Sequence, residues 1–216
     1  MQNIIHHGIT LDIHPDYSQF VGLHAENLGA FRRHIALHGL GQAFVLYAMG
    51  HAVAAIYMPT LKNRSACRIE NTPPDVGGFK AINSTNTPLG QICQLLSGYI
   101  AEYLFEGTDY GSVTSIDEWH AAYQLCELFG AKHEIPPHHV LTACVCAVES
   151  FLSEHESVIN FAAQYLAEAE GQELLSRGRG GLLSDVPRHD LGNAAFENLK
   201  EDWLEEEYRR VERLMP

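Results

Sequence analysis

The chain has 216 residues, 46% of them hydrophobic, so it is long enough to form one large domain with a substantial core. Its 27 acidic and 14 basic side chains give a net charge of −13. This balance argues against nucleic acid and anionic membranes as partners, because both bind through clustered Lys and Arg.

Three further features bear on the compartment. No run of about 18 apolar residues is present, so we expect no transmembrane helix. Residues 1–7 lack a basic segment followed by an apolar one, which is unlike a secretory signal. The cysteines are odd in number and lie mostly in apolar helical contexts, as reduced core thiols do. They are Cys67, Cys93, Cys126, Cys144 and Cys146. We therefore expect a cytoplasmic protein.

In chain order, the first regular element is a predicted helix over residues 26–49, ended by Gly50 as the C′ residue. Residues 52–59 are partly β-branched and predict a strand. The loop-rich stretch that follows is predicted to hold further short strands around residues 66–69 and 78–82. The first half of the chain thus predicts a small sheet beside one long helix.

The second half of the chain is predicted to be helical. Four helices are expected, over residues 87–105, 115–130, 136–153 and 156–169. The second of these begins with a capping box, in which Ser115 is the N-cap and Glu118 follows three residues later. We expect that helix to end near Gly130. The fold class is therefore mainly α (α+β), with short strands as a minor component.

The chain divides into one domain and three appended segments. We predict an N-terminal arm or short strand over residues 1–24, a helical domain over 25–176, a Gly- and Arg-rich loop over 177–189 and a charged amphipathic helix over 190–216. The last helix is suited either to pack on its own domain or to join two copies of the chain, and the sequence leaves both open.

The most informative segment is IALHGLGQAFV, residues 35–45. It resembles the motif helix of FtsH-type (AAA-protease) zinc metallopeptidases, whose pattern reads approximately I-A-x-H-E-A-G-H-A-x-V. In that motif two histidines on one helix face bind zinc, and the glutamate handles the proton of the metal-bound water. His38 matches the first histidine, Gly39 stands at the glutamate and Gln42 stands at the second histidine.

The resemblance continues at GSVTSID, residues 111–117, which is similar to the family's turn before an aspartate that opens a helix. That aspartate is the third zinc ligand of the family, so the resemblance implies that Asp117 is its counterpart. The likeness spans about residues 30–176 and rests on the order and spacing of elements. It implies a helical FtsH-peptidase-like domain that forms homo-oligomers. The ATPase module and membrane helices of the family have no counterpart here, so we expect a stand-alone domain.

A second register of the motif stays open. Residues 47–52, YAMGHA, also contain the G-H-A triplet, with His51 at the second histidine. This register lacks the first histidine and extends the helix beyond Gly50, into residues that predict a strand. Both registers lack the glutamate.

These substitutions predict a degenerate zinc site and a pseudoenzyme. A general base is typically worth about 10² to 10⁴ in rate, and Gly39 offers none. The neutral amide of Gln42 is a weaker zinc ligand than imidazole. We therefore expect no catalytic residue and no resident cofactor, in a metallopeptidase-like protein that binds a peptide or a partner protein.

The alternative is an active metal-dependent peptidase or hydrolase with a rearranged site. His34 lies four residues before His38, and His120 lies three residues after Asp117, so each pair shares a helix face. These four side chains could hold a metal, with zinc as the candidate. The simpler interpretation of His34 is an exposed side chain at the polar start of its helix.

Overall fold

The computed structural model describes residues 3–6, 9–12, 28–51, 53–57, 68–71, 87–106, 116–168, 173–175 and 181–201. Its elements are β1 (Asn3–His6), β2 (Ile9–Asp12), α2 (Leu28–Ala48), β3 (Val53–Tyr57), β4 (Arg68–Asn71), α3 (Pro88–Glu106), α5 (Ile116–His133), α6 (Pro137–Ser153), α7 (Glu156–Glu168) and β5 (Glu173–Leu175). A further helical segment covers residues 191–201. The described part of the chain is mostly helical, as predicted, and none of its helices is long and apolar enough to cross a membrane.

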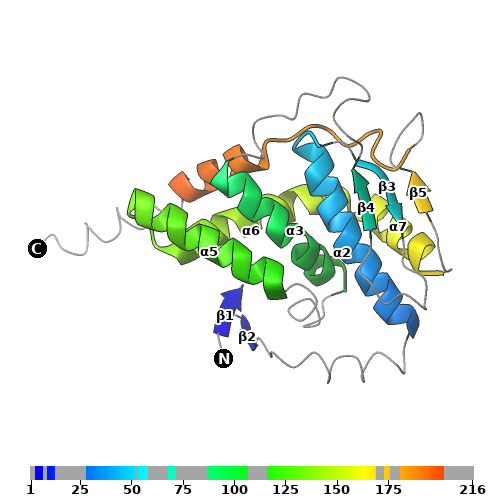
Figure 1. Cartoon of the computed structure of the whole chain (residues 1–216), viewed down its shortest axis with the longest axis horizontal. Coiled ribbons are helices and arrows are strands. Elements are labelled where there is room, and N and C mark those ends of the chain that lie inside the picture. Colours follow the sequence, from blue (N-terminus) through cyan, green and yellow to red (C-terminus); the bar gives the residue numbers. More distant parts are fainter. Residues whose placement is uncertain are drawn as a thin grey trace, which may run out of the picture.

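Helix α2 is the centre of the fold (Figure 1). It packs against α3 and α7 and contacts β3, while α3 packs in turn against α5 and α6. Most of the side chains of α2 are buried around its whole circumference, including Leu37, Leu40 and Phe44 at 0% exposure. A helix enclosed in this way has little water for its polar side chains, so each of them needs a partner within the protein.

Two glycines allow α2 and α3 to cross at close range. A Cβ added to Gly41 would overlap the Ser97 carbonyl oxygen and lie 2.6 Å from the Cβ of Ala101. A Cβ added to Gly98 would lie 2.5–2.7 Å from three ring atoms of His38. The crossing therefore leaves room for hydrogen atoms alone at these two positions.

Gly50 ends α2 as the sequence predicts. Its φ is 97°, a conformation that favours glycine, and its N–H donates to the Tyr47 carbonyl at 3.0 Å. The His51 N–H donates to the Leu46 carbonyl at 3.0 Å, which completes a Schellman motif. His51 thus lies beyond the helix, and the helical extension that the second motif register requires is not observed.

The end of the helix that was predicted near Gly130 lies slightly further along the chain. Helix α5 continues to His133, and Glu134 reverses the chain with a φ of 59°. A Cβ on Gly130 would overlap the Ile135 carbonyl oxygen, and the Gly130 carbonyl accepts a hydrogen bond from the Ile135 N–H at 2.9 Å. Glycine is needed here because the returning chain packs directly on the helix. The residue thus serves tertiary packing, although in the sequence it has the appearance of a helix terminator.

The strands form two antiparallel sheets. The order of the larger sheet is β4-β3-β5, with Ile56 opposite both Ile69 and Leu174. Strand β5 was not predicted from the sequence. Strands β1 and β2 pair within the N-terminal segment that was predicted as an arm. The strand predicted around residues 78–82 lies outside the described residues.

The segment that follows residue 181 packs on its own domain. The His189 N–H donates to the Ala48 carbonyl at 3.0 Å, and the Arg188 guanidinium lies 4.0 Å from the centre of the Tyr47 ring. In the helix of residues 191–201, Leu191 and Leu199 are buried in the core.

The cysteines in the described helices are free thiols. Cys93, Cys126 and Cys144 are fully buried. Burial raises the pKa of Cys126 to about 12 and the pKa of Cys144 well above its usual range. Thiols in this state pack as small hydrophobic groups and react slowly.

The glycine crossing can be tested with Gly41→Ala. Alanine ordinarily stabilises a helix interior relative to glycine by about 1 kcal/mol. Here the added methyl group must push the α3 backbone aside, so we expect a net loss of about 1–3 kcal/mol in the free energy of unfolding, measured by urea titration. The control Ser153→Ala, at an exposed position, should change it by less than about 0.5 kcal/mol. If Gly41→Ala is as stable as the wild type or more stable, the close approach of α2 and α3 at this position is contradicted.

Candidate functional site

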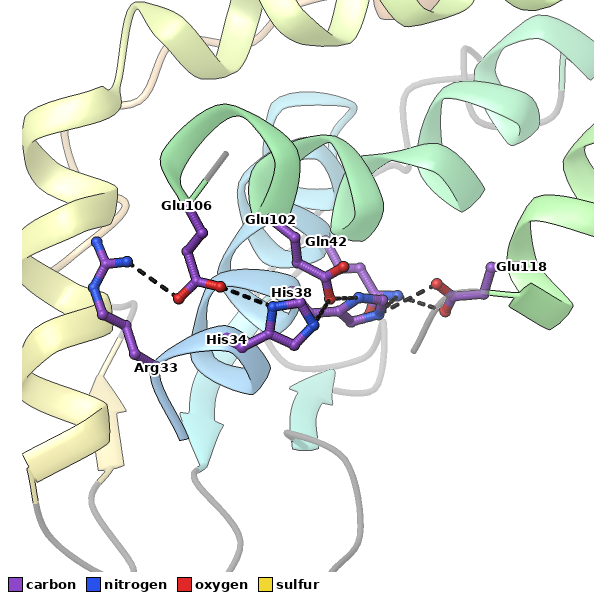
Figure 2. Close-up of polar contacts among 7 residues, drawn as sticks. All are labelled: Arg33, His34, His38, Gln42, Glu102, Glu106 and Glu118. Carbon is purple, nitrogen blue, oxygen red and sulfur yellow. Dashed lines mark hydrogen bonds and ion pairs between the residues drawn. The ribbon is translucent and has the colours of Figure 1, made fainter. Parts of the chain in front are cut away.

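The polar side chains of α2 form one row on the face that meets α3. His34, His38 and Gln42 follow one another at intervals of four residues, and Glu102 and Glu106 show the same interval on α3. Figure 2 shows these side chains in contact with each other and with one residue at each end of the row. We call this group the polar cluster: Arg33, His34, His38, Gln42, Glu102, Glu106 and Glu118.

Glu102 is the centre of the polar cluster. Its residue is 0% exposed, and its Oε1 lies 2.8 Å from His38 Nδ1 and 3.3 Å from His34 Nε2. Burying a carboxylate without partners would cost several kcal/mol. The two imidazoles supply these partners, so one carboxylate oxygen joins two successive turns of α2 to α3.

Glu118 closes the end of the polar cluster at α5 (Figure 2). Its Oε2 lies 3.2 Å from His38 Nε2, and its Oε1 accepts a hydrogen bond of 2.6 Å from the Gln42 amide. The Gln42 amide nitrogen also lies 3.0 Å from His38 Nε2. When His38 carries a proton on Nε2, both of these atoms are donors, so each donates to Glu118 instead.

Arg33 closes the opposite end of the polar cluster, at α7. His34 Nδ1 lies 2.8 Å from Glu106 Oε2, and Arg33 pairs with Glu106 Oε1 at 3.2 Å. Arg33 also donates to the Asn160 side-chain oxygen at 2.6 Å. The neighbouring Arg32 donates to the Ala167 carbonyl at 3.0 Å, among the last carbonyls of α7. The contacts of the row and its anchors thus connect four helices.

Exposure increases from the middle of the polar cluster to its ends. The Glu102 side chain is 0% exposed and that of His34 is 2%. The value rises to 14% at His38 and 32% at Glu118 toward α5, and to 26% at Arg33 toward α7. The middle is therefore dry, whereas both ends reach water.

His38 is the residue whose protonation the polar cluster changes most clearly. Burial by itself lowers the pKa of His38, but hydrogen bonds to Glu102 and Glu118 and the charges of both outweigh burial and raise this pKa to about 10. At neutral pH the ring is therefore an imidazolium that donates from Nδ1 to Glu102 and from Nε2 to Glu118.

The structure brings together His38 and Gln42, two of the three residues that the resemblance assigns to the metal site. The third, Asp117, lies in the first turn of α5, and its side chain is outside the described part of the chain. The next residue, Glu118, makes the contacts instead. Gly39 is buried within α2 and provides no side chain at the position of the general base.

The two candidate substitutes are placed differently from each other. His34 is buried at 1% exposure and joins the polar cluster, so the interpretation of His34 as an exposed side chain is wrong. The interior position of α2 buries the polar start of the helix as well as its middle. His120 is partly exposed on α5. Among the described residues of α5, Glu118 is the one whose contacts join the polar cluster.

Sequence reasoning missed the three glutamates of the polar cluster as site residues. One signal was available, because Glu102 and Glu106 are the only charged residues in the sequence of α3, and they are four residues apart. Such a pair on an apolar helix predicts a matching pair on a neighbouring helix, and His34 and His38 have that spacing. Nothing local distinguishes Glu118 from an ordinary capping-box residue.

These residues do not fit a zinc ion. Zinc binds imidazole nitrogen at about 2.0–2.1 Å through a lone pair, whereas both ring nitrogens of His38 face carboxylate oxygens at hydrogen-bonding distances of 2.8 and 3.2 Å. The described residues contain no group of three or more His, Cys, Asp or Glu side chains arranged to hold a metal. In comparison with known proteins, no family model and no curated protein matches the chain.

The raised pKa of His38 predicts how stability depends on pH. Between the ordinary histidine pKa of 6.5 and about 10, the folded chain holds a proton that the unfolded chain has lost. The stabilisation is therefore complete below pH 6.5 and decreases as pH rises, by at most about 1.4 kcal/mol per unit. Urea titrations at pH 6.5–8.5 should show this decrease for the wild type relative to His38→Gln. If the difference in unfolding free energy between the wild type and His38→Gln stays constant or grows with pH, the raised pKa of His38 is contradicted.

The buried and exposed glutamates should differ in their contribution to stability. Glu102→Gln removes the charge that faces two imidazoles in a dry site, and we expect a loss of about 3–5 kcal/mol. Glu118→Gln is the matched control, because Glu118 contacts the same histidine but is partly exposed, and it should cost under about 1 kcal/mol. Chemical denaturation at pH 7 measures both. Equal losses would show that burial of Glu102 is not what makes the contact strong.

Proposed function

We propose that the chain is a non-catalytic relative of FtsH-type zinc metallopeptidases, in which a hydrogen-bonded polar cluster stands in place of the metal site, and that it acts by binding a peptide or partner protein. One observation carries the proposal. Gln42 and His38, which match the two histidine positions of the motif, both contact the same Glu118 carboxylate, at 2.6 and 3.2 Å. In the family, the start of the corresponding helix supplies the third zinc ligand.

The chemistry of the two substituted positions supports the loss of activity. Hydrolysis in the family needs a base beside the metal-bound water, and Gly39 has no side chain to act as one. The amide of Gln42 donates a hydrogen bond to Glu118, so it faces this carboxylate as a donor rather than as a metal ligand. Arg33 and the His38 imidazolium supply positive charge beside the carboxylates of the polar cluster.

A binding role is supported by the exposed end of the polar cluster. The side chains of Glu118 and His38 are 32% and 14% exposed, whereas Glu118 Oε2 is buried, so a ligand would reach this end through the exposed part of the Glu118 side chain. Residues that hold each other through several hydrogen bonds are pre-organised, which lowers the entropy cost of binding. A peptide with a cationic or amide group is the kind of ligand that Glu118 would accept.

One observation favours the alternative of a rearranged metal site in an active hydrolase. His38 Nδ1 and His34 Nε2 point to the same oxygen of Glu102, so two imidazole nitrogens converge on one position. Occupation by a metal would require Glu102 to move aside. Because Glu102 is fully buried and holds both rings, we rank this alternative second.

Zinc content separates the two proposals. After dialysis against micromolar zinc, the wild type should contain far less than one zinc per chain by mass spectrometry of the metal, and it should not hydrolyse unfolded casein. Gln42→His restores an imidazole one turn from His38 and should increase the bound zinc. Gln91→His places a histidine at an exposed position of α3, with no other histidine three or four residues away, and serves as the control, with no increase expected. Stoichiometric zinc in the wild type that disappears in His38→Ala would overturn the non-catalytic proposal.

A further inference from the structure

Helix α7 carries an apolar stripe on its outer face. Val158, Phe161 and Tyr165 are 40%, 74% and 38% exposed, and their spacing of three and four residues places them on one side of the helix. We call these three residues the α7 stripe. The opposite side of the helix is packed in the core through Ile159, Ala162, Ala163 and Leu166.

The α7 stripe is unusual for a surface in contact with water. Single exposed apolar residues are common, but a row of them that includes a phenylalanine exposed over most of its area marks an interaction site. Aromatic residues of this kind provide much of the binding energy in protein interfaces. The stripe therefore offers an apolar contact surface about two helical turns long.

The charges carried by α7 itself and by the turn before it are all negative. Glu154 and Glu156 precede it and Glu168 follows it, and all three are exposed. Glu168 lies seven residues, or about two turns, after Phe161 and so on the same side of the helix. No Lys or Arg occurs between residues 154 and 168. A molecule that covers the stripe must therefore approach an acidic rim.

This rim distinguishes between the possible occupants. In a symmetric pair of chains, parallel α7 helices would place Glu168 opposite its own copy, and antiparallel helices would place Glu168 opposite Glu154. Both arrangements oppose like charges. An anionic membrane is repelled for the same reason. A partner with cationic groups beside an apolar row is attracted by both parts of the surface.

We propose that the outer face of α7 binds an amphipathic helix of a partner protein, whose apolar row contacts Val158, Phe161 and Tyr165 and whose Lys or Arg side chains pair with Glu154 and Glu168. Two helices that meet along apolar rows with charged edges form a standard mode of peptide recognition. This surface lies outside the polar cluster and goes beyond the proposed function, because it depends neither on the FtsH-type resemblance nor on zinc.

Helix α7 is held firmly enough to present such a surface. The Arg33 guanidinium holds Asn160, which precedes Phe161, and Arg32 donates to the Leu166 and Ala167 carbonyls at 3.4 and 3.0 Å. Because these bonds fix both the middle and the end of α7, little conformational entropy remains to be lost when a partner binds.

The probe for this proposal is a fluorescein-labelled peptide of about 18 residues, long enough for five helical turns, with a leucine row flanked by lysines. Fluorescence anisotropy with the full chain should show binding that weakens as salt is raised. A second peptide, with glutamate in place of every lysine, should bind at least about tenfold more weakly. Equal binding of the two peptides would overturn the assigned charge of the partner.

Variants of the full chain locate the binding surface. Phe161→Ser should weaken binding of the lysine peptide by about tenfold or more, and Glu168→Lys by several-fold. Leu128→Ser is the matched control, since Leu128 is 69% exposed on α5, and it should bind as the wild type does. Thermal melts verify that each variant is folded. If Phe161→Ser does not fold, Tyr165→Ser tests the same contact.

Three results would overturn the proposal. The first is unchanged affinity in both Phe161→Ser and Glu168→Lys. The second is a dimer, seen by sedimentation, that Phe161→Ser abolishes, which would identify a second copy as the occupant. The third is binding to phosphatidylserine vesicles that Phe161→Ser abolishes, which would identify a lipid surface.

Discussion

The contact of one buried carboxylate, Glu102, with two histidines of α2 is the interaction on which the rest of the structure depends. It forms because α2 and α3 approach each other closely enough for Gly41 and Gly98 to be the tolerated residues at the crossing. Once Glu102 is enclosed at that crossing, water cannot solvate its charge, and the imidazoles of His34 and His38 must do so. The histidines of α2 are therefore part of the core as well as part of the candidate site.

The same constraint extends in both directions along the helices. His38 has a second ring nitrogen, which faces Glu118 of α5, and His34 has one that faces Glu106, which in turn pairs with Arg33 beside α7. A buried ionic row of this kind is weak evidence for high stability, because desolvation offsets much of the attraction. It does limit how α2 and α3 can rotate relative to each other, since the polar rows of the two helices must face one another.

This arrangement gives a physical account of the segment for which we propose a relationship to metallopeptidases. With glycine at position 39 and an amide at position 42, this face of α2 completes a hydrogen-bonded contact with α5. Among the described residues, the surfaces that we propose for interaction are the outer end of the polar cluster, at Glu118, and the apolar outer face of α7. Arg33 and Asn160 connect α2, which carries the histidines of the polar cluster, to α7.

The sequence by itself determined the features that depend on neighbouring residues. The helical periodicity, the end of α2 at Gly50 and the alignment of His34, His38 and Gln42 on one face all follow from intervals of a few residues. The tertiary structure alone decided which charges meet. The partnership of His38 with Glu102 and Glu118 spans 64 and 80 residues of sequence, as 102 − 38 and 118 − 38.

At two other positions, tertiary packing outweighed the preference of the local sequence. Gly130 has the character of a helix terminator, yet it lies inside α5 because the returning chain presses on it at Ile135. His34 sits at the polar start of a helix, yet it is buried because α3 covers that turn. Local patterns report the preferences of a segment, whereas burial and charge pairing depend on which distant segment packs against it, and that information is distributed over the whole chain.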